Sequence, residues 1–152
     1  MDSTQKNYLS PIRPTVRAVI FRNGELLVQV KQKAGESPHL TLPGGKQEPG
    51  ESAHEALKRE CAEEIGTSVT VRELIHVAEV FKNRQEGTRH QLELLFACTI
   101  PEDYTPVVGP HPDPSQTGTI WASPRERRRE FQPDYAEALT NKAPLYLGLL
   151  NG

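Results

Sequence analysis

A helix from about Ala53 to Ile65 is the element that the sequence predicts most strongly. Ser52 and Glu55 have the spacing of a capping box, and Pro49-Gly50 supplies a turn just before them. Gly66 suits the left-handed position that follows a helix end. Apolar residues recur at four-residue spacing along the stretch: Ala53, Leu57, Cys61 and Ile65. The chain is therefore expected to bury one face of this helix.

Three glutamates share one face of the predicted helix near its C-terminal end. Glu60, Glu63 and Glu64 stand at i, i+3 and i+4, within an arc of roughly 100°. Like charges at this spacing repel, and anions at a helix C-terminus oppose the helix dipole. A magnesium ion would compensate, because it binds a few carboxylate oxygens while taking up substrate phosphates. Taken alone, such a cluster more often solvates a helix surface beside cations such as Lys58 and Arg59.

Apolar and β-branched runs on both sides of this helix predict a mixed sheet. Residues 15–21 and 26–30 flank Asn23-Gly24, a pair typical of a tight hairpin. Residues 69–81 and 90–100 flank a polar turn and predict a second hairpin. Strands that precede and follow a helix place the chain in the α/β class.

The C-terminal third combines a long proline-rich loop with helical patterns. Residues 101–117 hold five prolines, and we expect this loop either to contact substrate or to be weakly ordered. A short strand is expected at 119–122, and a serine-proline pair begins a helix expected over 124–131. A last helical stretch is expected over about 135–150, interrupted by Pro144.

The composition fits one globular domain spanning residues 1–152, and no repeat or linker divides it. Charged residues make up 25% and apolar residues 36% of the chain, which argues against disorder throughout. The net charge of −2 gives no global basic field for nucleic acid, and no run of roughly 18 apolar residues could span a membrane. The two cysteines are too few for a disulfide framework, and the five histidines lack zinc-ligand spacing. We therefore expect a cytoplasmic protein that binds neither nucleic acid nor membrane.

The residues around the three glutamates complete a longer pattern. Gly45 is followed after five residues by Glu51 and after seven more by Arg59. The 23 residues from Gly45 to Thr67 resemble the Nudix box of the Nudix hydrolase family. All seven fixed glycine, glutamate and arginine positions match, and the two departures, Cys61 and Thr67, lie at packing positions.

This resemblance implies both a fold and a reaction. The fold is an α/β/α sandwich with a mixed β-sheet between helices, here with a core of about residues 14–131 and a C-terminal helical segment of about 134–150. The reaction is the hydrolysis of a diphosphate linkage in a nucleoside diphosphate derivative, by attack of water on phosphorus. The chain is thereby identified as a divalent-metal-dependent pyrophosphohydrolase.

The resemblance also assigns roles within the box. The metal, Mg²⁺ or Mn²⁺, would be bound by Glu60, Glu64 and the backbone carbonyl of Gly44, with Glu63 as a further catalytic ligand or a contact to metal-bound water. Arg59 and Glu51 would support the catalytic group, because an arginine fork can hold a carboxylate at two points. Outside such a motif, this pair would be read as an ordinary surface salt bridge.

The general base is left open between the box and residues outside it. Glu60 is the first choice, since family members place the base either in the box or on a downstream loop. Asp113 is the nearest loop acid, and Glu86 and Glu93 are the other options.

The resemblance leaves the substrate undecided. Nucleoside triphosphates and ADP-ribose-like compounds are the leading small-molecule candidates, and their expected contacts are His39, Gly45, Glu86 and Asp113. A non-catalytic ligand-binding module of the same fold is a rival that the three intact glutamates argue against. A hydrolase acting on RNA 5′ ends is another, supported only by the arginine-rich run at 125–129. The assembly is left open between a monomer and a homodimer.

Overall fold

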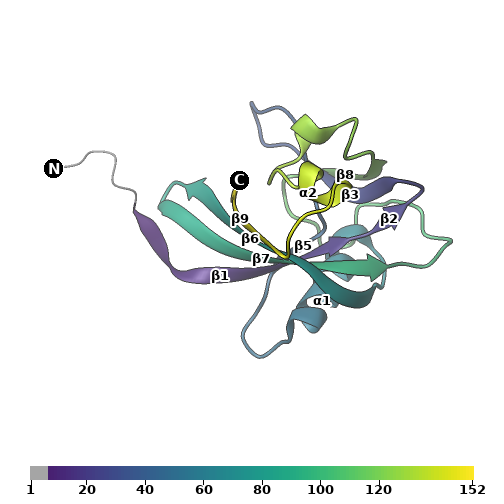
Figure 1. Cartoon of the computed structure of the whole chain (residues 1–152), viewed down its shortest axis with the longest axis horizontal. Helices are drawn as coiled ribbons and strands as arrows, with labels where there is room; N and C mark the ends of the chain where they lie inside the picture. The colour runs from purple at the N-terminus through teal and green to yellow at the C-terminus, as the bar shows by residue number, and fades with distance from the viewer. Residues whose placement is uncertain (1–6) are drawn as a thin grey trace.

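The computed structural model describes residues 7–152 as strands and short helices (Figure 1). The α/β class predicted from the sequence is confirmed. In chain order the elements are β1 (Tyr8–Val19), β2 (Phe21–Arg22), β3 (Glu25–Lys31), β4 (His39–Thr41), β5 (Gly44–Lys46), α1 (Ala53–Ile65), β6 (Thr70–Arg84), β7 (Gly87–Thr99), β8 (Gln116–Ala122), the 3-10 helix η1 (Arg128–Glu130), α2 (Ala136–Thr140) and β9 (Tyr146–Asn151).

The larger sheet has five strands in the order β5-β1-β7-β6-β9. β1 pairs in parallel with β7, and β9 pairs in parallel with β6. The β6–β7 hairpin and the β5–β1 pair are antiparallel. The mixed sheet predicted from the sequence is therefore confirmed. Figure 1 shows β1 and the β6–β7 hairpin extending together away from the rest of the molecule.

The smaller sheet is built around β3, with β2 and β4 along one edge and β8 along the other. The predicted turn between β2 and β3 is present, and Asn23 and Gly24 both have positive φ, 53° and 78°. Asparagine and glycine tolerate this conformation better than other residues. Because β4 belongs to the smaller sheet and β5 to the larger one, the step at Leu42-Pro43 joins the two sheets.

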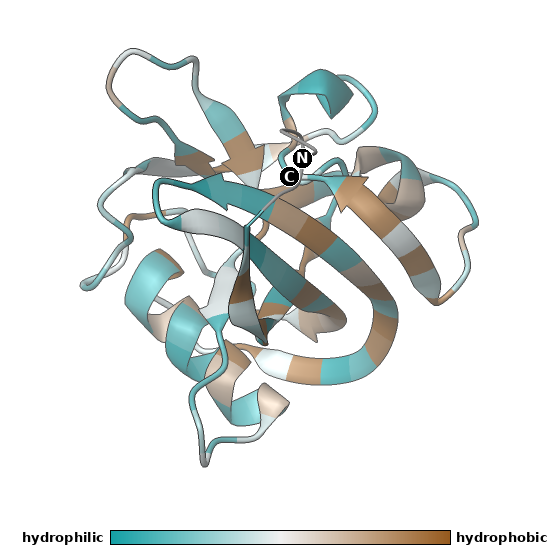
Figure 2. Cartoon of the chain, turned by 90° about the vertical axis from the view of Figure 1, so that its left-hand side faces the viewer, coloured by the Kyte–Doolittle hydropathy of each residue, from teal (hydrophilic) through white to brown (hydrophobic). Residues whose placement is uncertain are grey.

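The larger sheet separates two apolar cores. On one face, Val16 of β1 packs with Leu57 and other apolar residues of α1. On the opposite face, Val19 packs in a cluster that includes residues of β3 and Tyr135, just before α2. This division follows from the alternation of side chains along a strand. Figure 2 shows apolar residues along the strands and a largely polar outer surface on α1. A sheet between helices is thus the observed arrangement.

The C-terminal segment differs from the helices predicted for it. Residues 124–131 form turns and the short η1, because only Pro124 and Phe131 are buried and no apolar stripe exists to anchor an α-helix. Residues 135–150 contain only the five-residue α2 before the chain enters β9. Both helix predictions are therefore wrong. Pro144 disfavours continuation of the helix, and Leu147 and Leu150 pack against the core from the sheet edge.

Two expectations from composition can be compared with the described part of the chain. None of the helices within residues 7–152 is long and apolar enough to cross a membrane. Cys61 and Cys98 are both free and buried. The two thiols therefore act as small apolar core residues.

Candidate active site

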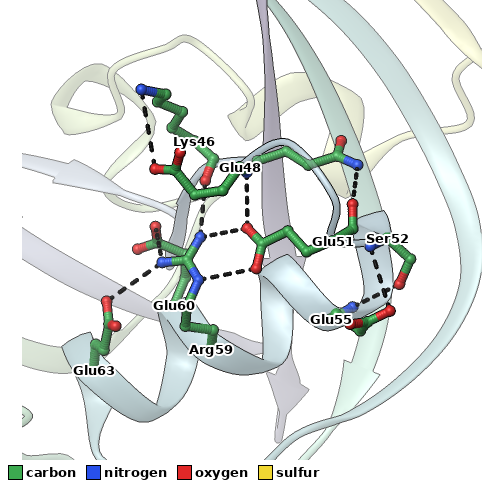
Figure 3. Close-up of polar contacts among 9 residues, drawn as sticks. Lys46, Glu48, Glu51, Ser52, Glu55, Arg59, Glu60 and Glu63 are labelled. Atoms are coloured by element: carbon green, nitrogen blue, oxygen red, sulfur yellow. Dashed lines mark hydrogen bonds and ion pairs between the residues drawn. The ribbon is translucent and has the colours of Figure 1, made fainter.

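Helix α1 begins and ends at the predicted residues. The Ser52 hydroxyl accepts from the Glu55 N–H at 3.1 Å, and the Glu55 carboxylate accepts from the Ser52 N–H at 3.4 Å (Figure 3). These reciprocal bonds form the predicted capping box. Gly66 follows the helix in the left-handed conformation, with φ of 69°. The positions of the acids on α1 are therefore well defined.

Arg59 ties the loop before α1 to the helix surface. Its Nε and Nη2 donate to the two carboxylate oxygens of Glu51 at 3.1 and 2.6 Å, and Nη2 also donates to the Lys46 carbonyl at 3.1 Å (Figure 3). A two-point contact of this kind fixes orientation as well as distance. The hydrogen bonds from Arg59 hold the pKa of Glu51 below its ordinary value. The structure thus brings together the two residues expected to support the site.

Glu60 lies between Arg59 and the glycine turn. Arg59 Nη1 donates to Glu60 Oε1 at 3.0 Å. A Cβ atom at Gly45 would stand 2.6 Å from the carboxyl carbon of Glu60, so this carboxylate approaches the turn only because residue 45 is glycine. Burial raises the pKa of Glu60, and the hydrogen bond from Arg59 opposes that rise.

Glu64 is buried beside the same turn, with 5% of its surface exposed. Its Oε1 accepts the Gly44 N–H at 3.2 Å. Gly44 has φ of 143°, and a Cβ there would lie 1.9 Å from the carbonyl oxygen of Val16, so only glycine fits. Burial, and then the nearby charge of Glu60, raise the pKa of Glu64 to about 7. Two carboxylates that repel each other in a desolvated place favour a bound cation.

Glu60 and Glu64 are the pair that fits a hard divalent cation. No group of three acidic, histidine or cysteine side chains is positioned to hold a metal within residues 7–152. Glu63 instead faces Arg59, whose Nη1 lies 3.5 Å from Glu63 Oε2. Magnesium is usually bound through one or two carboxylates, with water and substrate phosphates completing its shell. The donor chemistry of Glu60 and Glu64 therefore fits Mg²⁺ or Mn²⁺, and Glu63 lies near Glu60 across the shared Arg59 nitrogen.

The C-terminal end of α1 is covered by the proline-rich loop. The Tyr104 hydroxyl donates to the Ile65 carbonyl at 2.6 Å, and Gln116 Nε2 donates to the Glu64 carbonyl at 2.9 Å. The N–H groups of Gly109 and His111 donate to the carbonyls of Glu64 and Glu63, both at 2.9 Å. Carbonyls at a helix end lack partners within the helix, so this loop satisfies them. The sequence contains no local signal for this contact.

The acids considered as alternative bases lie in different environments. Glu93 is fully buried and accepts hydrogen bonds from Arg17, Gln91 and Tyr135. Burial alone would raise the pKa of Glu93, but the Arg17 guanidinium holds it below its ordinary value. Glu86 is exposed at the β6–β7 turn. Asp113 accepts from the Ser115 N–H and hydroxyl at 2.8 and 2.6 Å.

His39 and Asp113 line one cavity of about 700 Å³. Two of the four expected substrate contacts are therefore brought together. Gly45 lies against Glu60 instead, and Glu86 is not among the residues that line this cavity. Burial, followed by the charges of Lys31 and Lys82, lowers the pKa of His39.

Lys31 and Lys82 also line the cavity, and the sequence interpretation did not single them out. A signal for Lys82 existed in the pattern of β6. Ala78 and Val80 are fully buried, and side chains two residues apart share one face of a strand. A lysine at the next position of that face therefore points toward the interior side of the sheet.

Comparison with known proteins agrees with the box and the fold. The NUDIX domain family model matches residues 11–141. The CTP pyrophosphohydrolase of Escherichia coli strain K12 is 30% identical over 112 residues, which cover 73% of this chain and 76% of that protein.

Solved structures show the same fold. A NUDIX hydrolase from Nitrosomonas europaea superimposes with a TM-score of 0.64 at 25% identity, covering 89% of this chain and 83% of the other. The Escherichia coli ORF135 protein gives a TM-score of 0.60 at 26% identity, covering 84% and 85%. The chain therefore belongs to the NUDIX domain family, and its assignment as a pyrophosphohydrolase is confirmed.

Proposed function

We propose that this protein uses Mg²⁺ or Mn²⁺ to hydrolyse a diphosphate linkage in a nucleoside diphosphate derivative, with a nucleoside triphosphate as the leading substrate. The observation that carries this proposal is the pairing of Glu60 with Glu64 against the Gly44-Gly45 turn. Charge repulsion and burial both raise the pKa of Glu64, and a divalent cation relieves both costs.

Glu60 and Glu64 would hold the metal, with the carbonyl of Gly44 as a further oxygen donor. When bound, such an ion neutralises phosphate charge and lowers the pKa of the attacking water. Arg59 orients Glu60 and keeps the loop that carries Glu51 against the helix. These residues then hold their positions while charge develops on the phosphates.

Glu60 is the general base in this proposal. Glu93 has its carboxylate occupied by three buried donors, and Glu86 stands at the end of the hairpin. Asp113 Oδ1 accepts two hydrogen bonds from Ser115, and its Oδ2 lies 3.9 Å from Lys31 Nζ. Glu60 lies beside Glu64. Its Oε1 accepts from Arg59, so its Oε2 would accept a proton from water. Arg59 would then stabilise the group when it returns to its charged form.

The rival functions receive less support. A binding module would not need Glu60 and Glu64 together at a glycine turn. In the arginine-rich run, Arg127 pairs with Glu130 at 2.7 Å and Arg128 with Glu137 at 3.5 Å. Much of that positive charge is thus neutralised within the protein, which disfavours an RNA channel. CTP is the first triphosphate to test, because the Escherichia coli relative is a CTP pyrophosphohydrolase.

A cytoplasmic location is part of this proposal. The two free, buried thiols are consistent with a reducing compartment, in which most proteins lack disulfides. A homodimer stays an open expectation, to be checked by light scattering.

The test is a screen of CTP, other triphosphates and ADP-ribose with Mg²⁺ or Mn²⁺, scoring phosphate-containing products. Glu60→Gln and Glu64→Gln keep the side-chain shape while removing charge. Glu60→Gln should lower kcat by about 10²–10⁴-fold, the typical contribution of a general base. Glu64→Gln should be partly rescued by more metal, and Glu73→Gln, an exposed change on β6, should behave as wild type. No turnover of any diphosphate with either metal, or near-normal turnover by both site variants, would contradict the proposal.

A further inference from the structure

The cavity that contains His39 and Asp113 is strongly basic. It lies among the end of β3 and the segment after it, the end of β6, and the loop before β8. Its acidic lining residues are Glu36 and Asp113. Its basic lining residues are Lys31, Lys33, Lys82 and Arg84.

Lys82 is half-buried in this cavity, and no carboxylate within residues 7–152 forms an ion pair with it. No carboxylate in residues 7–152 lies within 4.0 Å of its Nζ, whereas Lys31 Nζ is 3.9 Å from Asp113 Oδ2. Burial, followed by the charges of Arg17, Lys31 and Arg84, lowers the pKa of Lys82 to about 8, although the charge of Glu93 opposes this fall. Cations that repel one another in a partly desolvated place are costly unless an anion joins them.

The cavity is poorly suited to stack a nucleobase. The rings that line it are those of His39 and Phe81, and the Phe81 ring packs edge-on against Tyr8 at 5.2 Å and His90 at 4.8 Å. Phe81 and Lys82 are consecutive in β6, so their side chains point to opposite faces of the sheet. Lysine and arginine side chains therefore outnumber the rings that a ligand could meet there, and they bind phosphate through charge-assisted hydrogen bonds.

The loop that lines the cavity with Asp113 also bonds to the acidic end of α1, where the Gly109 and His111 N–H groups donate to the Glu64 and Glu63 carbonyls. Lys31 contributes to the cavity wall, and the charges of Glu64 and Glu60 both act on its pKa, together with that of Asp113. Burial is the larger influence and lowers the pKa of Lys31, which the three acids oppose. A substrate whose diphosphate lies at Glu60 and Glu64 could thus extend past Lys31 into the cavity.

We infer that this cavity is a second phosphate subsite, which binds a phosphate group of the substrate that is not part of the cleaved linkage. Lys82, Arg84 and Lys31 are the residues that hold it. The inference rests on the proposed function and narrows its substrate class. It favours substrates with a further phosphate, such as a triphosphate, over those that end in a neutral sugar, such as ADP-ribose.

The kinetic test compares CTP with CDP and ADP-ribose in the wild type, Lys82→Met and Arg84→Gln. Methionine keeps the length of the lysine side chain and removes its charge. The wild type should prefer CTP in kcat/KM, and each variant should lower that preference by about tenfold or more through KM. Turnover of ADP-ribose should change little. Lys142→Met, an exposed change far along the chain, is the matched control.

A binding test separates the subsite from catalysis. Calorimetry with inorganic tripolyphosphate, with and without Mg²⁺, should show binding to the wild type and to Lys142→Met that Lys82→Met weakens. Thermal melts check that each variant is folded. Equal binding by wild type and Lys82→Met, or an unchanged CTP preference in both cavity variants, would overturn the inference while leaving the proposed function standing. Absence of all turnover would remove the proposed function, and tripolyphosphate binding alone would then decide whether the cavity is a phosphate site.

Discussion

The two ends of α1 are held in different ways. At the N-terminal end, Ser52 and Glu55 bond to each other's backbone within one turn, and Arg59 reaches Glu51 eight residues earlier. At the C-terminal end, the donors come from Tyr104 and Gln116, which are 39 and 52 residues from their acceptors. One end is thus stabilised by local contacts and the other by tertiary contacts.

The difference reflects where the acids lie. The last turn of α1 contains no basic residue, so the negative end of the helix dipole meets Glu63 and Glu64 without local compensation. The loop of residues 104–116 supplies hydrogen-bond donors to the carbonyls of that turn. A site that needs negative charge at a helix C-terminus therefore depends on a distant segment to stabilise it.

Gly109→Ala should produce the largest loss of stability, because it disrupts the contact between the loop of residues 104–116 and the C-terminal end of α1. A Cβ at this position would lie 2.3 Å from the Glu63 carbonyl oxygen, so the loop must move off the helix. Overpacking and unsatisfied carbonyls together should lower the free energy of unfolding by about 3 kcal/mol or more, and kcat should fall. Gly118→Ala is the control, since its nearest contacts would be an ordinary 3.9 Å. Urea unfolding measures both, and a Gly109→Ala protein as stable as wild type would show that the loop does not hold the helix end.

The metal-free protein should lose stability as pH rises. The pKa of Glu64 is raised in the fold from 4.5 to about 7, by burial and by Glu60. The folded state therefore binds more protons than the unfolded state between these values. Stability contributed by protonated Glu64 is fully present below pH 4.5 and is lost as pH rises through 7, by about 3 kcal/mol.

Urea unfolding with EDTA from pH 5 to 8 measures this slope. Glu64→Gln should flatten it, whereas Glu55→Gln, at the local end of α1, should keep it. An unchanged slope in Glu64→Gln would assign the pH dependence to other groups.

Tyr104→Phe tests one hydrogen bond of the tertiary end. The change removes the donor to the Ile65 carbonyl, together with the weaker acceptor of the Val107 N–H at 3.4 Å, and leaves the ring in place. The free energy of unfolding should fall by about 1–2 kcal/mol, the cost of an unsatisfied carbonyl, with a measurable loss of kcat. Chemical denaturation and steady-state kinetics on the same sample are the measurements. Wild-type values in both would mean that water replaces the hydroxyl.

Ser52→Ala tests the N-terminal end of α1, again by removing one hydroxyl group. Loss of the capping hydroxyl should lower the free energy of unfolding by about 1 kcal/mol. Because Ser52 lies more than a turn from Glu60 and Glu64, and its side chain bonds to the Glu55 backbone rather than to Glu51 or Arg59, kcat should remain at the wild-type value. A kcat loss as large as that of Tyr104→Phe would erase the contrast between the two ends.

Arg59→Ala should have the smallest effect on stability and a clear effect on activity. Its ion pairs are partly exposed, with 32% of the side chain accessible, so their removal should change the free energy of unfolding by less than about 1 kcal/mol. Release of Glu51 and Glu60 should lower kcat by roughly 10–100-fold, as for other residues that orient metal-binding groups. Lys58→Ala, the adjacent exposed cation, is the control, and unchanged kinetics in Arg59→Ala would remove its supporting role.

The sequence predicted the parts of the fold whose determinants lie close together in the chain. The bounds of α1, the Asn23-Gly24 turn and the β6–β7 hairpin all follow from capping, turn and alternation rules that act over a few residues. The same rules failed after residue 123. There, α2 is short and residues 146–151 form β9. Periodicity alone predicted a helix for these residues, but they pair with β6 as a strand instead.

Within the site, the sequence by itself determined the bounds of α1 and the shared face of Glu60 and Glu64, because capping and helix periodicity act over a few residues. The approach of Glu64 to Gly44, 20 residues earlier, is a tertiary contact. Only the tertiary structure decided how the far end of α1 is capped and where the basic cavity lies. Lys31, Lys82 and Asp113 come from three separated segments, and their proximity depends on strand pairing rather than on sequence spacing. Contacts of that kind produce no periodic pattern in a single sequence, because they form only when the two sheets pack together.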